Sequence, residues 1–341
     1  MTPLLLPILA DPRTGGKLVL EDAVYESEAI VAGRLVAEDG AAYPIVRGIP
    51  RFLPPGLAAS VKSFGDEWNY FNFTDFKPQW LSHTVRNTFG STDAFRDKIV
   101  VDAGGGSGAQ SLWILESGAR HVIMLELSHS VDDVVQRNID SRRWRNFDLI
   151  QCSIDTPPLA PRSIDGIVMC HNVIQHTPSV ERTARALFDL VKPGGEFVFN
   201  CYAKNDVGVL RWVRWHLIYV PLREVLRRMP FRVIVAYARL MAYLNLIPGL
   251  GLMLNKLLLC AQGDVPFVPG EGTFDRWRRR FKACSLNTMD AFGSHAFQHH
   301  KTDGEIQALV RDLQPDVAKV GNFDDYFRRP QPIGIALRVF K

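Results

Sequence analysis

From Lys98 to about residue 204, short apolar runs take turns with segments in which apolar residues fall at helical spacing. Apolar runs of strand length predict buried strands at residues 98–103, 121–127, 147–152, 163–170 and 196–202. Between these runs, apolar residues fall at helical spacing and predict helices at residues 109–118, 130–139 and 179–191. This alternation of strands and helices predicts an α/β fold with a doubly wound, mostly parallel sheet. In such a sheet, ligands bind outside the carboxyl ends of the strands.

The rest of the chain follows other patterns. Residues 1–56 carry short alternating runs divided by glycine and proline, and residues 43–56 predict an extended, proline-stiffened segment that closes them. We expect five regions: a small β-rich module at 1–56, a helical lead-in at 57–97, an α/β core at 98–204, a helical insertion at 205–300, and a helix with two antiparallel edge strands at 301–341.

The segment VVDAGGGSGAQS predicts a strand that runs into a glycine-rich turn and then a helix. Gly104, Gly106 and Gly108 allow the backbone to turn tightly and approach a ligand closely. A helix that begins near Ser107 presents free backbone N–H groups at the same point. The spacing also matches G-x-G-x-x-A with Ala109, so the turn alone leaves a dinucleotide site, or a turn without a ligand, open.

Asp102, directly before the glycines, separates these alternatives. A carboxylate there repels a pyrophosphate at short range, whereas S-adenosylmethionine has no phosphate and carries a sulfonium and an ammonium. Glu126 ends the second strand, where an acid accepts hydrogen bonds from ribose hydroxyls. A solvated acid at a strand end is the alternative reading of Glu126. The two acids together predict S-adenosylmethionine as the cofactor.

The next two strand ends also carry polar residues. Ser153 and Ile154 follow the third strand and could meet an adenine, one by a polar contact and one by packing. The segment CHNVIQHTP follows the fourth strand and places Asn172 and His176 at the mouth of the expected cleft.

These segments resemble the class I S-adenosylmethionine-dependent methyltransferases. The resemblance rests on VVDAGGGSG, LEL, CSIDTPPLAPRSIDGIVMCHNVIQHTP and LVKPGGEFVF, which cover about residues 98–203 in the family's order. It implies a Rossmann-like, seven-stranded sheet. It also implies that Asp102 and the glycines hold the methionine end of the cofactor, Glu126 the ribose, and Ser153 with Ile154 the adenine. The implied cofactor-binding residues are Phe64, Trp68, Asp102, Gly104, Gly106, Gly108, Glu126, Leu127, Ser153, Ile154 and Asn172.

Two features refine the resemblance. SFGDEWNYF and YPIVRGIPRFL look like a branch with an N-terminal Trm112-like, zinc-ribbon-derived module, in which Phe64 and Trp68 form part of a lid over the cofactor. The family more often has an acid at Ser153, a role that Asp155 could take. Gly105 stands where the family usually has cysteine, which is tolerable because the backbone makes the contacts.

The N-terminal module lacks the metal ligands of that branch. Its two cysteine pairs would fall at Asp11, Thr14, Val36 and Asp39, and threonine and valine are poor ligands for structural zinc. We expect a metal-free module that is held together by packing and serves in docking or oligomer contact. A hard-metal site at Asp11 and Asp39 is the alternative.

Three residues are candidates for the acceptor side. Methyl transfer mainly requires alignment, and a base is needed only for a protonated nucleophile. His176 titrates in a useful range, although a capping or packing role is equally open. The pair His295 and His299 has i, i+4 spacing, but no third ligand is evident, so no metal is predicted. The predicted catalytic residues are His176, Tyr202 and His299.

The insertion interleaves arginine with large apolar residues. Seven arginines and the single acid Glu224 lie in residues 209–240, and FDRWRRRFK follows at 274–282. This composition suits peripheral contact with an anionic membrane, a substrate cap over a lipophilic acceptor, or a helical cap with solvated arginines. A net charge of +4 and no recognisable nucleic-acid module argue against nucleic acid as a partner.

Composition bounds the remaining choices. With 341 residues, 47% hydrophobic and 22% charged, the chain is globular. Five cysteines without a CxxC pair indicate free thiols in a reducing compartment. The run Leu240–Asn255 is interrupted by Pro248 and is short for a bilayer span, and MTPLLLPILADPR lacks the features of a signal peptide. We expect a soluble, cytoplasmic protein, and its oligomeric state stays open.

The sequence therefore predicts a methyltransferase that acts on a small, lipophilic or aromatic acceptor at oxygen, nitrogen or carbon. Two alternatives stay open. One is a non-catalytic binding protein of the same fold that uses the basic insertion for a membrane or a partner. The other is a nucleotide-dependent oxidoreductase.

Overall fold

The computed structural model describes residues 1–53, 58–140, 143–204, 208–261, 263, 265–293, 295–320 and 337–341. The chain forms two compact units, which are described separately here. Unit 1 comprises Met1–Thr74, His83–Ala203 and Phe297–Lys341, and unit 2 comprises Asp75–Ser82 and Lys204–Ala296. The division into five regions stays a prediction.

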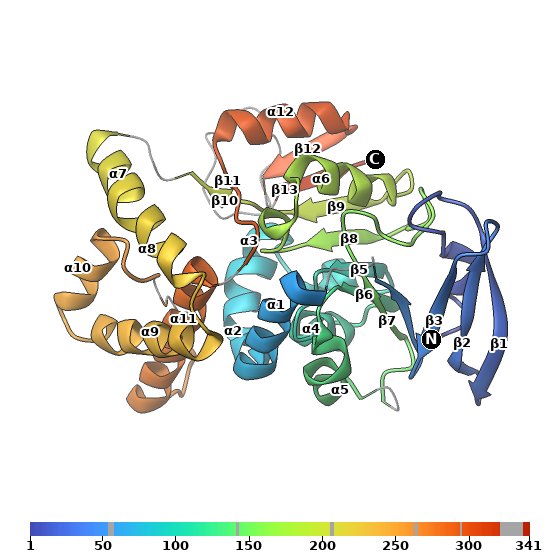
Figure 1. Ribbon diagram of the computed structural model, residues 1–341, viewed down its shortest axis with the longest axis horizontal. Coiled ribbons are helices and arrows are strands. Elements are labelled where there is room, and N and C mark those ends of the chain that lie inside the picture. The colour runs from blue at the N-terminus through green and yellow to red at the C-terminus, as the bar shows by residue number, and fades with distance from the viewer. Residues whose placement is uncertain are drawn as a thin grey trace. The chain divides into compact units, whose positions relative to one another are not determined.

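Unit 1 contains a long mixed sheet (Figure 1). Its described strands follow the order β1-β2-β3-β4-β7-β6-β5-β8-β9-β13-β12. The inner pairs from β4 to β9 are parallel, whereas β13 and β12 run antiparallel at one end and β1 to β3 at the other. The strands are β1 Leu18–Glu26, β2 Ala29–Ala37, β3 Ala42–Val46, β4 Ile49–Phe52, β5 Ile99–Ala103, β6 His121–Glu126, β7 Phe147–Cys152, β8 Ile167–Cys170, β9 Glu196–Phe199, β12 Val317–Val320 and β13 Leu337–Phe340.

The predicted α/β, Rossmann-like architecture is confirmed, but the described sheet has eleven strands where seven were expected. The difference is the four N-terminal strands β1 to β4, which join the sheet because residues 43–53 do not form the extended closing segment that was predicted for residues 43–56. Arg47 (φ 54°) and Gly48 (φ 74°) form a tight turn, so β3 and β4 make a hairpin. Arg51 and Phe52 of β4 then pair in parallel with Gln151 and Cys152 of β7. The N-terminal strands thereby continue the α/β sheet.

Alternation along the strands assigns the two faces of this sheet. Val101 and Ala103 of β5, and Ile123 and Leu125 of β6, share a buried cluster with α6 (Val180–Asp189) and α12 (Asp303–Leu313). Figure 1 shows these two helices together on one side of the sheet. Asp102 lies between two residues of that face and therefore points to the opposite one, where α4 (Ala109–Glu116) packs.

The helices of unit 1 are short. They are α1 Ala58–Phe71, α3 Arg86–Thr88, α4 Ala109–Glu116, α5 Val134–Asn138, α6 Val180–Asp189 and α12 Asp303–Leu313, with 3-10 turns η1 Leu6–Ile8, η4 Thr92–Phe95, η5 His129–Asp132 and η6 Ile174–His176. The π-helical turn η3 Trp80–Val85 and the 3-10 turn η2 Phe73–Phe76 cross the boundary between the units. A separate parallel pair joins β10 Tyr202–Ala203 and β11 His300–Lys301.

Unit 2 is helical in its described residues. Its core includes Tyr219, Leu226 and Phe292, against which Tyr237 packs. No helix among the described residues is both long and apolar enough to cross a bilayer. The helices are α2 Lys77–Gln79, α7 Val209–Arg214, the π-helical turn η7 Trp215–Tyr219, α8 Val220–Leu226, α9 Phe231–Asn245, α10 Leu250–Lys256 and α11 Thr273–Phe292.

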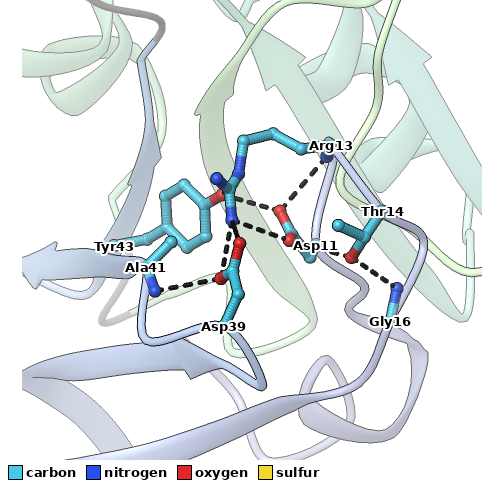
Figure 2. A network of polar contacts seen from close by, with 7 residues as sticks. All are labelled: Asp11, Arg13, Thr14, Gly16, Asp39, Ala41 and Tyr43. Atoms are coloured by element: carbon cyan, nitrogen blue, oxygen red, sulfur yellow. Dashed lines mark hydrogen bonds and ion pairs between the residues drawn. The ribbon is translucent and has the colours of Figure 1, made fainter.

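The N-terminal strands are joined by a polar network (Figure 2). The buried Asp11 carboxylate accepts hydrogen bonds from Tyr43 Oη at 2.6 Å and Thr14 Oγ1 at 2.9 Å. The Arg13 guanidinium binds Asp11 at 3.2 Å and Asp39 at 2.6 Å. Two of the four positions where the resemblance placed cysteines, Asp11 and Asp39, thus bind one guanidinium, and a third, Thr14, donates to Asp11. The module is held by ion pairs as well as by the packing that the sequence predicted.

Candidate functional site

The glycine-rich turn at the end of β5 requires its glycines. Gly104, Gly106 and Gly108 have φ values of 84°, 59° and 77°, a region that L side chains rarely adopt. A Cβ on Gly104 would lie 2.4 Å from Val173, and one on Gly106 would lie 2.8 Å from Trp68. Backbone N–H groups of the turn bind the carbonyl of Leu125 at the end of β6. The turn is therefore fixed and closely covered.

Helix α1 supplies that cover. Asn69 fixes it to the first residue of α5, accepting from Val134 N–H at 3.1 Å. A Cβ on Gly65 would lie 2.2 Å from His129, so only glycine at this position allows α1 to pack so closely against His129. Phe64 and Trp68 stand one helical turn apart. Trp68 covers the glycine turn, while the Phe64 ring lies 5.4 Å from that of His176.

Asp102 is buried and held by neutral donors. Gln110 Nε2 donates to one carboxylate oxygen at 2.7 Å, and Ser111 Oγ donates to the other at 2.6 Å. Burial raises the pKa of Asp102 to about 6, and the nearby charge of Glu126 acts in the same direction. Sequence reasoning missed Gln110 and Ser111. Their signal is position, since both lie in the first turn of the helix that follows the glycines.

Glu126 is the second buried carboxylate of the site. It accepts from Gly106 N–H at 2.9 Å and from Ser128 N–H at 2.8 Å. Burial raises its pKa as well. Among the described residues, no lysine, arginine or histidine forms an ion pair with Asp102 or Glu126. Two carboxylates thus share a desolvated site without a cation from the described chain.

The residues expected near an adenine lie after β7. The Ser153 hydroxyl donates to Asp155, which forms an ion pair with Arg182 of α6. Ile154 is buried, and Leu127, at the end of β6, is half-buried. The acid proposed as a substitute for Ser153 is therefore in direct contact with it.

Asn172 follows β8 in a left-handed conformation, with φ 58°. Its N–H donates to Asn200 Oδ1 at 2.7 Å, and Asn200 Nδ2 donates to its side-chain oxygen at 2.6 Å. The ends of β8 and β9 are thus tied together. Next to it, burial lowers the pKa of His171 to about 4, so this imidazole is neutral at physiological pH.

The three predicted catalytic residues lie in one neighbourhood. The rings of His176 and Tyr202 are 5.6 Å apart, edge to face. His176 Nδ1 lies 3.1 Å from the Phe297 carbonyl, which can only accept, so Nδ1 carries the proton and Nε2 holds the lone pair of the neutral ring. His299 Nε2 lies 3.0 Å from the Thr177 carbonyl and donates to it. The spacing of His295 and His299 is not helical, because α11 ends at Phe292.

Residues 101–199 match a protein family described as a methyltransferase domain. Among solved structures, the chain is similar to an S-adenosylmethionine-dependent methyltransferase from Mesorhizobium loti, with 23% identity over 34% of this chain and 52% of that chain, and a TM-score of 0.30. It is also similar to an arsenic(III) S-adenosylmethionine methyltransferase from Chlamydomonas reinhardtii, with 23% identity, coverage of 37% and 46%, and a TM-score of 0.30. The chain spans about half the length of these two proteins. No curated protein sequence matches it.

The family match runs from within β5 to the end of β9 and therefore contains the glycine turn and both buried carboxylates. It supports a class I methyltransferase domain with S-adenosylmethionine as its cofactor, in agreement with the sequence prediction. TM-scores this low add nothing about activity. The roles of the individual site residues and the acceptor stay predictions.

Proposed function

We propose that this protein transfers a methyl group from S-adenosylmethionine to a small, lipophilic or aromatic acceptor. The observation that carries the proposal is the pair Asp102 and Glu126. They are buried at the ends of adjacent strands beside a glycine turn, and the described chain supplies them with no cation. A ligand with positive charge and hydroxyl groups would lower the electrostatic cost of burying these two carboxylates, whereas a pyrophosphate would raise it.

The chain's own groups fit the parts of this cofactor. The cofactor supplies a methyl group that its sulfonium already activates. Asp102 would hold the ammonium of the methionine end, and the free lone pairs of Glu126 would accept from the ribose hydroxyls. Ser153 and Asp155 would face the adenine amino group beside Ile154. The indole of Trp68 would exclude water from the turn that it covers.

The acceptor would lie beside His176 and Tyr202. Both rings contact other aromatic groups, Phe64 on one side and His300 on the other, so the surroundings favour an apolar acceptor. In the neutral ring, Nε2 of His176 would take the proton of a hydroxyl acceptor. His299 donates its ring N–H to Thr177 and its backbone N–H to Gln175. These contacts favour a positioning role for His299.

Isothermal titration tests the cofactor assignment. We expect S-adenosylhomocysteine to bind and NADH not to bind. Asp102→Asn keeps the shape of the side chain and removes its charge, and it should weaken binding of S-adenosylmethionine by roughly 1–3 kcal/mol. Gln136→Glu on α5 is the control. Tight binding of NADH instead, or an unchanged affinity of the Asp102 variant, would contradict the assignment.

Turnover separates an enzyme from a binding protein of the same fold. Transfer of a labelled methyl group to any member of a panel of hydroxylated aromatic and isoprenoid compounds would support catalysis. His176→Gln should then lower kcat for hydroxyl acceptors and leave the affinity for S-adenosylhomocysteine unchanged. If the chain binds the cofactor but methylates no acceptor, the non-catalytic alternative is favoured.

A further inference from the structure

Helix α9 of unit 2 carries apolar side chains on two opposite sides. Ile234, Val235, Ala238 and Ala242 form its buried side. The other side presents large apolar residues to solvent at helical spacing, with Leu240 54% and Tyr243 59% exposed. A helix that packs in a globular protein normally exposes a polar face. The exposed members of this side are Val233, Leu240 and Tyr243, and Ile247 is exposed in the turn that follows the helix.

The neighbouring helices of unit 2 repeat this feature. Leu252 and Met253 are exposed on α10, which packs against α9. Leu217 is 65% exposed in the π-helical turn η7, and Val225 is exposed on α8. Scattered exposed apolar residues need no explanation, but a series that runs over four consecutive elements does.

The charges around these residues have one sign. Between Gly208 and Ala261 the sequence has seven arginines and Lys256 against one acid, Glu224. That acid is already paired with Arg227 and Arg228. On α9, the exposed residues Arg232 and Arg239 directly precede Val233 and Leu240. Arginine can extend its charged end toward water or phosphate while its aliphatic stem lies on apolar surface.

We propose that η7 and helices α8 to α10 form a docking surface for an anionic lipid bilayer. The helices would lie in the plane of the headgroups, with the exposed aliphatic residues in the acyl boundary and the exposed arginines on lipid phosphates. Charge complementarity favours this occupant, since basic residues far outnumber the single acid in this segment. A nucleic acid would be read by stacked aromatic residues, whereas the exposed residues of α9 and α10 are mainly aliphatic. The proposal is independent of the cofactor assignment.

Vesicle flotation tests the proposal on the full-length protein. One set of vesicles is phosphatidylcholine alone, and the other contains phosphatidylcholine and phosphatidylglycerol in about equal parts. We expect binding to the anionic vesicles only, weakened by added salt because screening acts on exposed charges. Leu240→Glu combined with Leu252→Glu should lower the partition coefficient at least about tenfold. Arg232→Gln and Arg239→Gln should lower it about fivefold each.

Val19→Glu, at a site 62% exposed on β1 of unit 1, is the matched control and should bind vesicles as the wild type does. Circular dichroism and unchanged affinity for S-adenosylhomocysteine show that each variant is folded. The proposal is overturned if the wild type or Val19→Glu fails to bind anionic vesicles. It is also overturned if the Leu240→Glu, Leu252→Glu variant binds them as strongly as the wild type does. Retention of a single-stranded RNA without vesicle binding, or a dimer that Leu240→Glu dissociates, also overturns it and identifies another occupant.

Discussion

Unit 1 contains two clusters of acidic residues whose carboxylates are held in different ways. Burial acts to raise the pKa of Asp11, but hydrogen bonds from Tyr43, Arg13 and Thr14 outweigh this and lower it. Asp102 accepts hydrogen bonds from only two side chains, and burial outweighs them and raises its pKa. Asp11 thus has more donors, among them the backbone N–H and the guanidinium of Arg13, and no described cation pairs with Asp102.

A structural acid and a binding acid differ in how their charge is compensated. An acid that has its own cation stabilises the fold, and little of its charge remains uncompensated for a ligand. An acid that is desolvated without a cation costs folding energy, and a positively charged ligand recovers that energy on binding. Removing charge should therefore have opposite effects on stability in the two clusters. Three experiments test this, in order of decreasing expected effect.

The largest effect concerns pH. Folding raises the pKa of Asp102 from 3.8 to about 6, so the folded state binds more protons than the unfolded state in that window. Stability should therefore fall as pH rises from about 4 to about 6, by up to about 3 kcal/mol for this group. Asp102→Asn should remove this group's part of the dependence, leave that of Glu126, and be the more stable protein near neutral pH. Urea titrations across this pH range measure the free energy of unfolding. Parallel curves of this free energy against pH for the wild type and the variant would refute the prediction.

Removal of Asp11 should act in the other direction. Asp11→Ala leaves Tyr43 and Arg13 without their buried acceptor and should lower the free energy of unfolding by about 2 kcal/mol. The affinity for S-adenosylhomocysteine should stay the same. Glu38→Ala, at an exposed acid of the same module, is the control and should change neither quantity. Weaker cofactor binding by the Asp11 variant would show that the two clusters are coupled.

The smallest effect separates the Tyr43 hydroxyl from the ion pairs. Tyr43→Phe removes the hydroxyl that donates to Asp11 and accepts from Arg13 Nε, and it keeps both carboxylates of the Arg13 ion pairs. We expect a loss of about 1.5 kcal/mol in chemical denaturation, because two partly exposed hydrogen bonds are lost and no charge is removed. A loss as large as that of Asp11→Ala would mean that the hydroxyl, and not the guanidinium, holds the cluster together.

The sequence predicts the local features of this fold well. The strands from β5 to β9 follow from runs of apolar residues, and the glycine turn follows from spacing, because both are properties of neighbouring positions. The pairing of β4 with β7 joins residues about a hundred positions apart, and periodicity contains no information about it. The ion pair of Arg13 with Asp39, 26 positions away, was likewise visible only in the structure. Gln110 and Ser111 lie close to Asp102 in the sequence, but periodicity does not give the direction in which their side chains donate. Parallel pairing of β5 to β8 brings the residues predicted at the ends of these strands to one edge of the sheet.

The hairpin of β3 and β4 has a consequence for any attempt to shorten this protein. β7 is rich in apolar residues, and β4 occupies the backbone groups along part of its outer side. A truncated version that starts at the α/β core would leave that side of β7 uncovered, and uncovered strands of this kind recruit other chains. We expect such a fragment to aggregate, because the N-terminal strands cover the edge of the α/β sheet.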